Sequence, residues 1–354
     1  MSYACRILAI DGGGIRGAIP ATILTQIEAA LGKPIYQCFD IIAGTSTGGL
    51  IALALTTPVI KGNQPTPPMA AADVLNMYMN DEGDIFKKQT GNNGATYQSI
   101  APWLQSILGK LTLSQAAQLL PSLGHAAPKQ VLTTCYTING APAANIGPYL
   151  FNWVDAFASA ADNYYVWEAA LATSSAPTYF PLAQVGQGAT NGSSATGRRG
   201  ADGGVVANNP ALYALAWAWK LGLCATIKDV LVVSLGTGLY NAAIQIGNGG
   251  NWNTYYWGDG KDVNNNPAVP LLDVLSNSNV LAPDAQLQYT MPPGNYYRLE
   301  PAVSYAESQM DGTDTAALKQ TAVQYTSPGG QGYNAYQSVI EALGPTAGLF
   351  RKVG

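Results

Sequence analysis

The hydrophobic pattern of the first 60 residues alternates between short apolar runs and longer helical stretches. CRILAI at 5–10 and FDIIA at 39–43 are short apolar runs, which predict two buried strands. The stretch 17–32 repeats apolar residues at helical spacing, and TGGLIALAL at 47–55 is apolar all round, so we expect one amphipathic and one buried helix. This order of elements, joined by short turns, predicts a parallel sheet covered on both faces.

The same pattern continues along the rest of the chain with longer interruptions. Further predicted helices lie within 69–123 and over 163–181, 209–222 and 333–344, and further strands over 130–138 and 229–238. Two stretches, 186–200 and 239–266, are rich in Gly, Ser or Asn, which predicts loops. Weaker helical patterns follow the second loop.

No internal repeat or shift in composition divides the chain, so we predict one elaborated domain over 1–354. The predicted fold class is α/β, a three-layer sandwich whose central, mainly parallel sheet is covered by helices on both faces. The motifs described below fall within about 5–240, and residues 241–354 form a C-terminal extension that carries no motif.

Composition narrows the classes of partner. The 354 residues carry a net charge of −4, which argues against a nucleic-acid partner, because such proteins favour a basic face. Charged residues make up only 11% of the chain and hydrophobic ones 47%, which fits a large core or a surface that meets something apolar. The four cysteines form no C-x-x-C pair, so we expect free thiols and no metal site.

The first residues, MSYACRILAIDGGG, lead directly into a strand without a basic segment or a long apolar segment. This pattern predicts no signal peptide. The longest apolar runs, such as DVLVVSLG, are too short to span a bilayer. We therefore expect a soluble, cytoplasmic protein that is peripheral at membranes, with export by a signal-independent route as the alternative.

The sequence GTSTGG at 44–49 places Ser46 between glycines, where a predicted strand gives way to a predicted helix. Gly44 and Gly48 complete a G-x-S-x-G pattern, in which a sharp turn lifts the serine hydroxyl above the carboxyl edge of the sheet. The serine would also lie at a helix N-terminus, where positive potential favours a developing anion. We predict that Ser46 is a nucleophile, and an ordinary tight turn is the alternative.

A second glycine-rich turn, DGGGIRG at 11–17, follows the first predicted strand. It fits the dinucleotide-binding fingerprint G-x-G-x-x-G, but Asp11 would put a carboxylate beside the pyrophosphate, and the acidic residue expected after the second strand is missing. The other use of such a turn is an oxyanion hole made of free backbone N–H groups. For Arg16 we consider bracing of this loop, added positive charge, or a surface ion pair.

A serine nucleophile needs a base, and the chain has one histidine, His125, in a loop-like stretch without a motif. Asp202 in GADGGVVANNP is the better candidate, because two glycines before a predicted helix hold it on an uncovered turn. A carboxylate with a pKa of about 3.9 is a weak base toward an alcohol, but a partly dehydrated site raises its basicity. A plain Asp-Gly-Gly turn is the alternative.

Five motifs together resemble the patatin-like phospholipase family. In chain order they are DGGGIRG, GTSTGG, SSAPTYFP, DGGVVANNP and VVSLGTG, and they span roughly residues 5–240. The resemblance implies a serine–aspartate dyad in a parallel α/β sandwich, with Ser46 as the nucleophile and Asp202 as the base. It implies an oxyanion hole formed by the backbone of Gly12, Gly13 and Gly14, with Arg16 nearby.

We therefore predict a serine acyl hydrolase that cleaves fatty-acyl esters of phospholipids or related membrane lipids through an acyl-enzyme, without metal or cofactor. The expected partner is a lipid or a membrane surface, contacted transiently. The alternatives are a storage or binding protein with little turnover, a latent lipase switched on by an activator, and a nucleotide-binding protein that uses the turn at 12–17.

Two further groups of residues are candidates for contact with lipid. The predicted loop 239–266 contains Trp252, Tyr255, Tyr256 and Trp257, and amphipathic aromatic residues suit a membrane interface or a lid. Packing of this loop on the domain is the alternative. Arg198 and Arg199 precede Asp202 and would either touch a headgroup or form a solvated pair.

Overall fold

The computed structural model describes residues 3–88, 96–124, 126–140, 146–186, 197–245 and 257–344. Its main sheet has eight strands in the order β12-β9-β1-β2-β5-β8-β7, with β6 paired to β5 outside this path. The strands are β1 (Cys5–Ile10), β2 (Ile41–Gly44), β5 (Gln130–Gly140), β6 (Gly147–Asn152), β7 (Ala183–Val185), β8 (Arg198–Asp202), β9 (Val230–Leu235) and β12 (Tyr296–Leu299). Two separate hairpins are β3 (Val59–Lys61) with β4 (Gln64–Thr66), and β10 (Gly260–Lys261) with β11 (Pro267–Ala268).

The centre of the sheet is parallel and one end is antiparallel. The pairings from β12 through β9, β1 and β2 to β5 are parallel. The pairings of β5 with β6 and β8, and of β8 with β7, are antiparallel. The predicted α/β class with a mainly parallel central sheet is confirmed.

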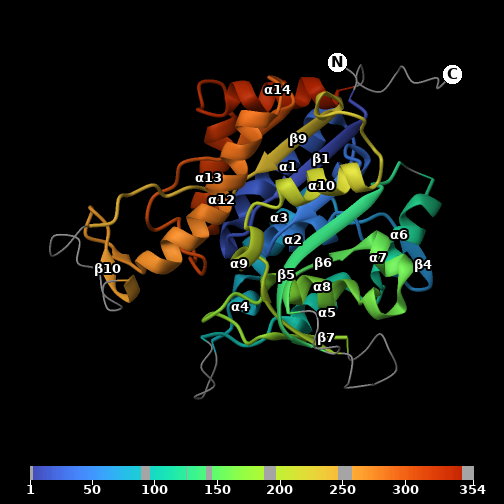
Figure 1. Cartoon of the computed structure of the whole chain (residues 1–354), viewed down its shortest axis with the longest axis horizontal. Coiled ribbons are helices and arrows are strands. Elements are labelled where there is room, and N and C mark those ends of the chain that lie inside the picture. Colours follow the sequence, from blue (N-terminus) through green and yellow to red (C-terminus); the bar gives the residue numbers. More distant parts are fainter. Residues whose placement is uncertain are drawn as a thin grey trace.

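Helices cover both faces of this sheet (Figure 1). They are α1 (Ala18–Leu31), α2 (Thr47–Ala54), α3 (Ala71–Asn80), α4 (Glu82–Ile85), α5 (Ala101–Leu108), α6 (Leu113–Ser122), α7 (Trp153–Ala158), α8 (Val166–Ser174), α9 (Gly204–Ala207), α10 (Ala211–Lys220), α12 (Pro270–Thr290), α13 (Thr315–Thr326) and α14 (Tyr333–Leu343). Side chains of β1 alternate between the two layers, because successive residues of a strand point to opposite faces. Leu8 and Ile10 pack with α1, α2 and α8, whereas Ile7 and Ala9 pack with α10 and the end of α12.

Most of the predicted elements are present with bounds shifted by a few residues. The end of the predicted loop 186–200 is wrong, because β8 begins at Arg198. Arg198 is buried there: its Nε donates to Tyr164 at 2.7 Å, and its guanidinium lies 3.9 Å from the centre of the Tyr149 ring. Neither a headgroup contact nor a solvated pair describes this arginine, whereas Arg199 is exposed.

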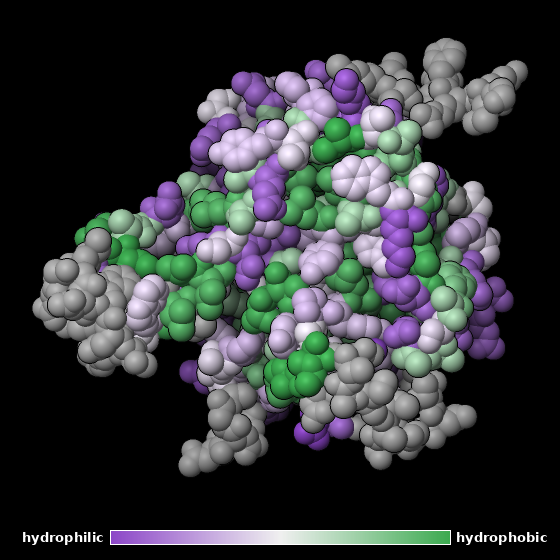
Figure 2. Space-filling model, viewed as in Figure 1, coloured by the Kyte–Doolittle hydropathy of each residue, from purple (hydrophilic) through white to green (hydrophobic). Residues whose placement is uncertain are grey.

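The C-terminal segment takes part in the main sheet. β12 pairs with β9 at the edge of the sheet, and Leu318 of α13 and Val339 of α14 join the larger core with α1. The last turn of α12 is buried at Leu287, but its first half exposes a row of apolar side chains, which Figure 2 shows over the projecting part of the helix. The exposed residues of this row are Leu271, Val274, Leu275 and Leu281.

Among the described residues, no helix combines the length and apolar character that crossing a bilayer requires. The cysteines are free, as expected: Cys5, Cys38 and Cys135 are buried, and Cys224 is partly exposed. Of the aromatic residues predicted to contact lipid, only Trp257 lies in the described part of the chain, where 36% of it is exposed.

Candidate active site

Ser46 stands on a sharp turn between β2 and α2. Its φ of 54° and ψ of −125° are rare for a residue with a side chain, and α2 begins at the next residue. The turn depends on both flanking glycines. A Cβ atom at Gly44 would overlap the carbonyl of Gly48, and one at Gly48 would overlap the carbonyl of Ile10. The structure therefore has the strand–turn–helix geometry that the G-x-S-x-G pattern predicts.

Asp202 lies against this serine. Ser46 Oγ donates a hydrogen bond of 2.6 Å to Asp202 Oδ2, and the other carboxylate oxygen accepts a 2.6 Å hydrogen bond from the Gly204 N–H. Both side chains are buried, with 5% of Ser46 and 4% of Asp202 exposed. Burial raises the pKa of Asp202 to about 7, while the hydrogen bonds from Ser46 and Gly204 act in the opposite direction.

The two residues meet because β2 and β8 pair with the same edge of β5. β2 runs parallel to residues 130–133 of β5, and β8 runs antiparallel to residues 135–140. β6 pairs with residues 132–137 of β5. This range overlaps both the residues that pair with β2 and those that pair with β8, so β6 lies along the other edge of β5. β2 and β8 therefore run toward each other and end on either side of Thr134, the first near Ser46 and the second at Asp202.

The glycine turn that follows β1 packs beside Ser46. A Cβ atom at Gly12 would lie 3.0 Å from Ser46 Cβ, and the Gly12 N–H already donates to the Asn208 carbonyl at 3.1 Å. Within the described part of the chain, the N–H groups of Gly13 and Gly14 donate to no carbonyl or side chain. These two amides are the donors that the turn leaves for a ligand, and Gly12 supplies the contact with the serine.

Each of the three glycines in this turn packs closely against the protein at the position where another residue would have its Cβ atom. A Cβ atom would overlap the side chain of Asn208 at Gly12, the side chain of Thr237 at Gly13, and the backbone of Met310 at Gly14. Gly14 also has a φ of 61°. Close packing within the chain thus explains these glycines, which removes the main reason for a dinucleotide interpretation, namely close approach to a pyrophosphate.

Arg16 braces the turn. Its Nε donates to the carbonyl of Gly13 at 3.2 Å, and its Nη1 donates to the carbonyl of Gly238 at 2.8 Å. Thr237 Oγ1 adds a 2.8 Å hydrogen bond to the carbonyl of Gly12. Of the three interpretations considered for Arg16, bracing of the loop describes these contacts.

A narrow apolar cavity of about 30 Å³ opens beside Ser46. Its walls come from several helices and loops, and the large side chains among them include Leu50, Tyr78, Phe86, Ile100 and Phe180. Phe180 lies in the motif SSAPTYFP, but sequence patterns did not single out the other four, because they are side chains at ordinary helical or loop positions. His125, by contrast, lies outside the described residues.

Comparison with known proteins gives the family. The sequence profile described as "Patatin-like phospholipase" matches residues 8–215. The chain belongs to the patatin-like phospholipase family. Patatin-like protein 2 of Oryza sativa subsp. indica is 30% identical over 304 residues, which cover 79% of this chain and 71% of the relative. Patatin-like protein 2 of Arabidopsis thaliana is 28% identical over 383 residues, which cover 98% of this chain and 91% of the relative.

Two further comparisons give one more similar sequence and one similar solved structure. Patatin-T5 of Solanum tuberosum is 31% identical over 250 residues, which cover 66% of this chain and 60% of Patatin-T5. Among solved structures, VipD from Legionella pneumophila is 11% identical, with a TM-score of 0.43. The match covers 97% of this chain and 67% of the VipD chain.

The predicted family is therefore confirmed, and membership in the patatin-like phospholipases implies lipid acyl hydrolase activity. The matched span includes Ser46, Asp202 and the glycine turn, but it ends before Thr237 and Met310, which pack against that turn.

Proposed function

We propose that the protein hydrolyses fatty-acyl ester bonds of phospholipids or related membrane lipids through a dyad of Ser46 and Asp202. The 2.6 Å hydrogen bond from Ser46 Oγ to Asp202 Oδ2, formed beside an apolar cavity, is the observation that carries this proposal. The cavity is lined by apolar side chains, as an acyl chain requires, and Ser46 forms part of its wall. At about 30 Å³ it must widen to admit such a chain.

The proposed reaction has two steps. Ser46 Oγ attacks the acyl carbonyl while its proton passes to Asp202, and the N–H groups of Gly13 and Gly14 stabilise the oxyanion. The alcohol or lysolipid leaves with the proton from Asp202, so the acyl group remains on Ser46. A water molecule then attacks the acyl-enzyme, with Asp202 again accepting and returning the proton, and the fatty acid is released.

Fatty-acid release from mixed phospholipid vesicles tests this function. Purified protein is incubated with vesicles in EDTA, and free fatty acids and lysolipids are identified by mass spectrometry, with Ser46→Ala protein as the blank. We expect release by the native protein alone. Loss of release in EDTA would contradict a metal-independent reaction. No release from vesicles or from a soluble short-chain ester would favour the storage or binding alternative.

The burial of both dyad residues favours one variant of this proposal, a latent enzyme that opens at a lipid surface or on binding an activator. In that case the protein would hydrolyse a small soluble ester faster than phospholipid in vesicles. Addition of an activator, or a change of lipid composition, would raise only the vesicle rate.

The pH dependence of kcat/KM is expected to follow the ionisation of Asp202. Only the carboxylate accepts the proton of Ser46, and burial raises its pKa to about 7. The rate should therefore fall about tenfold per pH unit below this pKa and level off above it. Initial rates on a soluble ester between about pH 5 and pH 9 measure this profile.

His125 provides the control for this prediction, because an ordinary histidine ionises in the same range. A His125→Ala variant should keep the rate and the profile of the native protein. A profile that loses its ionisation in this variant, or a rate that falls more than about a hundredfold, would assign the base to His125 instead.

Replacing Phe180 with alanine is expected to weaken binding of long acyl chains. Phe180 lines the cavity and is partly buried, so its removal takes apolar contact from a bound chain. We expect KM for a long-chain ester to rise about tenfold, whereas KM for an acetate ester changes little. Kinetics on esters of increasing chain length measure this difference.

Phe157→Ala is the matched control, because Phe157 is 51% exposed and lies on α7 rather than in the cavity. It should leave the dependence on chain length unchanged. An equal rise of KM for acetate and long-chain esters in Phe180→Ala protein would place the acyl chain elsewhere.

A further inference from the structure

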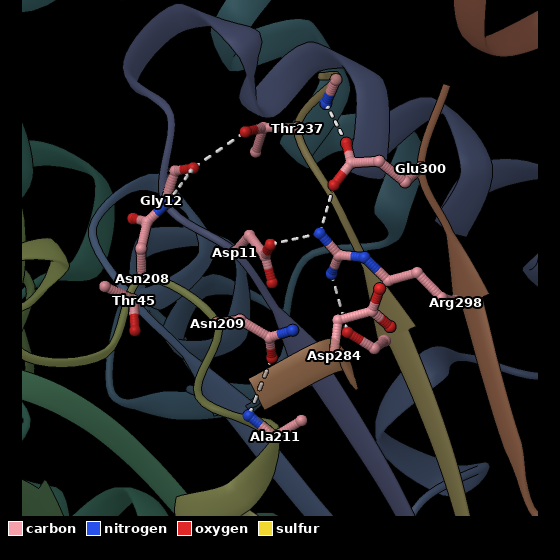
Figure 3. A network of polar contacts seen from close by, with 12 residues as sticks. Asp11, Gly12, Thr45, Asn208, Asn209, Ala211, Thr237, Asp284, Arg298 and Glu300 are labelled. Atoms are coloured by element: carbon pink, nitrogen blue, oxygen red, sulfur yellow. Dashed lines mark hydrogen bonds and ion pairs between the residues drawn. The ribbon is translucent and has the colours of Figure 1, made fainter. Parts of the chain in front are cut away.

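An arginine of β12 forms a buried ion pair with the residue that begins the glycine turn. Arg298 Nη2 lies 2.6 Å from Asp11 Oδ2, and its Nη1 donates to Ser234 Oγ at 2.8 Å (Figure 3). Glu300 contacts the same Nη2 from the other side. The side chains of Arg298 and Asp11 are only 10% and 1% exposed. Asp11 directly precedes the glycines, so this ion pair fixes the start of the turn.

A second set of contacts, made by the residue that follows β12, reaches the other side of the same turn. Glu300 Oε1 accepts a 2.6 Å hydrogen bond from the Gly238 N–H. The carbonyl of Gly238 accepts from Arg16, and Arg16 also donates to the carbonyl of Gly13. Arg298 of β12 and Glu300, which follows this strand, thus hold the turn through Asp11 on one side and through Arg16 on the other.

The ion pair also balances the negative charge of the buried Asp11 carboxylate beside the turn. Asp11 is fully buried, and its Oδ1 has no hydrogen-bond partner in the described part of the chain. Burial raises the pKa of Asp11, and the Arg298 guanidinium opposes that rise. Without this cation, Asp11 would take up a proton near neutral pH, and at higher pH its carboxylate would repel an oxyanion that forms on the neighbouring amides.

We propose that Arg298 is a positioning residue for the reaction: through Asp11 it holds the Gly13 and Gly14 amides in place and balances the charge beside the forming oxyanion. This inference rests on the function proposed above. It assigns an active-site role to β12, which lies beyond residues 8–215 that match the family. No local motif marks Arg298, which is 287 residues from Asp11 in the sequence.

Kinetics of Arg298 variants test the proposal. Arg298→Gln should lower kcat about 100-fold, because small misplacements of transition-state donors have effects of this size, and should leave KM within about threefold. Arg298→Lys should recover part of this loss, since lysine keeps the charge but lacks the planar fork. Adding Asp11→Asn to Arg298→Gln should restore kcat about tenfold at high pH, where the unpaired carboxyl is ionised, and should change it little at neutral pH, where burial keeps this carboxyl protonated.

Asn295→Ala, at the residue before β12, is the matched control. Asn295 precedes β12 and its Nδ2 donates to the carbonyls of Val230 and Lys228 at 2.6 and 3.0 Å, so its loss weakens the attachment of β12 without touching the turn. It should lower the melting temperature and leave kcat unchanged. An equal loss of kcat in this control, or native kcat in Arg298→Gln, would overturn the proposal.

Hydrogen exchange tests the positioning of the turn independently of the proposed hydrolase activity. Mass spectrometry measures amide exchange in peptides that cover residues 11–17, where Arg298→Gln should exchange faster than native protein and Asn295→Ala should not. Unchanged exchange in Arg298→Gln overturns the inference even if the native protein hydrolyses lipid. Native protein that releases no fatty acid, with faster exchange in Arg298→Gln, contradicts the proposed function and supports the positioning of the turn.

Discussion

Replacement of Ser46 by alanine is expected to abolish ester hydrolysis, lowering kcat by about 10⁵-fold while the fold is retained. The hydroxyl of the next residue does not take its place, since Thr47 Oγ1 is bound to Tyr78. Alanine has the same β-carbon as serine and so adds no strain at a φ of 54°. Fatty-acid release and thermal unfolding of both proteins measure the two halves of this expectation.

A serine-reactive fluorophosphonate gives an independent readout. It should label native protein at Ser46 and leave Ser46→Ala protein unlabelled, as peptide mass spectrometry would show. Ser122→Ala is the control substitution, because its hydroxyl bonds only the carbonyl of Leu119 on its own helix. Hydrolysis by Ser46→Ala protein within about tenfold of the native rate would rule out Ser46 as the nucleophile.

The parts of the site that depend on local backbone geometry could be predicted from the sequence. The turn around Ser46 needs glycine at 44 and 48 because the chain passes too close to itself for a Cβ atom, and such a constraint leaves a readable pattern. Asp202 was recognised from the two glycines that follow it, but the expected uncovered turn is wrong. Asp202 ends β8 and is only 4% exposed, and a Cβ atom at Gly203 would overlap Thr134. Each of these patterns is contained in a few consecutive residues.

The parts that depend on pairing between distant strands could not be predicted. The sequence predicted β5 as a strand, but not that β2 and β8 share one of its edges, which brings Ser46 and Asp202 together. The strand β12 was missed because its sequence, YYRL, is not a continuous apolar run, and its arginine has no distinguishing neighbours. Arg198 was misjudged because the Gly/Ser-rich stretch before it suggested that the loop continued.

Replacement of Asp202 by asparagine is expected to lower kcat by about 10³- to 10⁴-fold without disturbing the fold, because an amide cannot accept the proton of Ser46. The asparagine has the atoms to keep both hydrogen bonds, accepting from the Gly204 N–H and donating to Ser46 Oγ. Kinetics on a soluble ester measure the loss. A rate within about tenfold of the native protein would exclude Asp202 as the base.

The same variant should be more stable than the native protein at high pH. The pKa of Asp202 is about 7 in the folded protein against a reference value of 3.8, so the folded state keeps a proton that the unfolded state has released. Stability from this group is therefore present at low pH and is lost as pH rises through about 7. Since asparagine does not titrate, the stability advantage of Asp202→Asn should grow by roughly 2–3 kcal/mol between about pH 5 and pH 8. Urea unfolding at both pH values measures it, and an advantage independent of pH would show that burial does not raise this pKa.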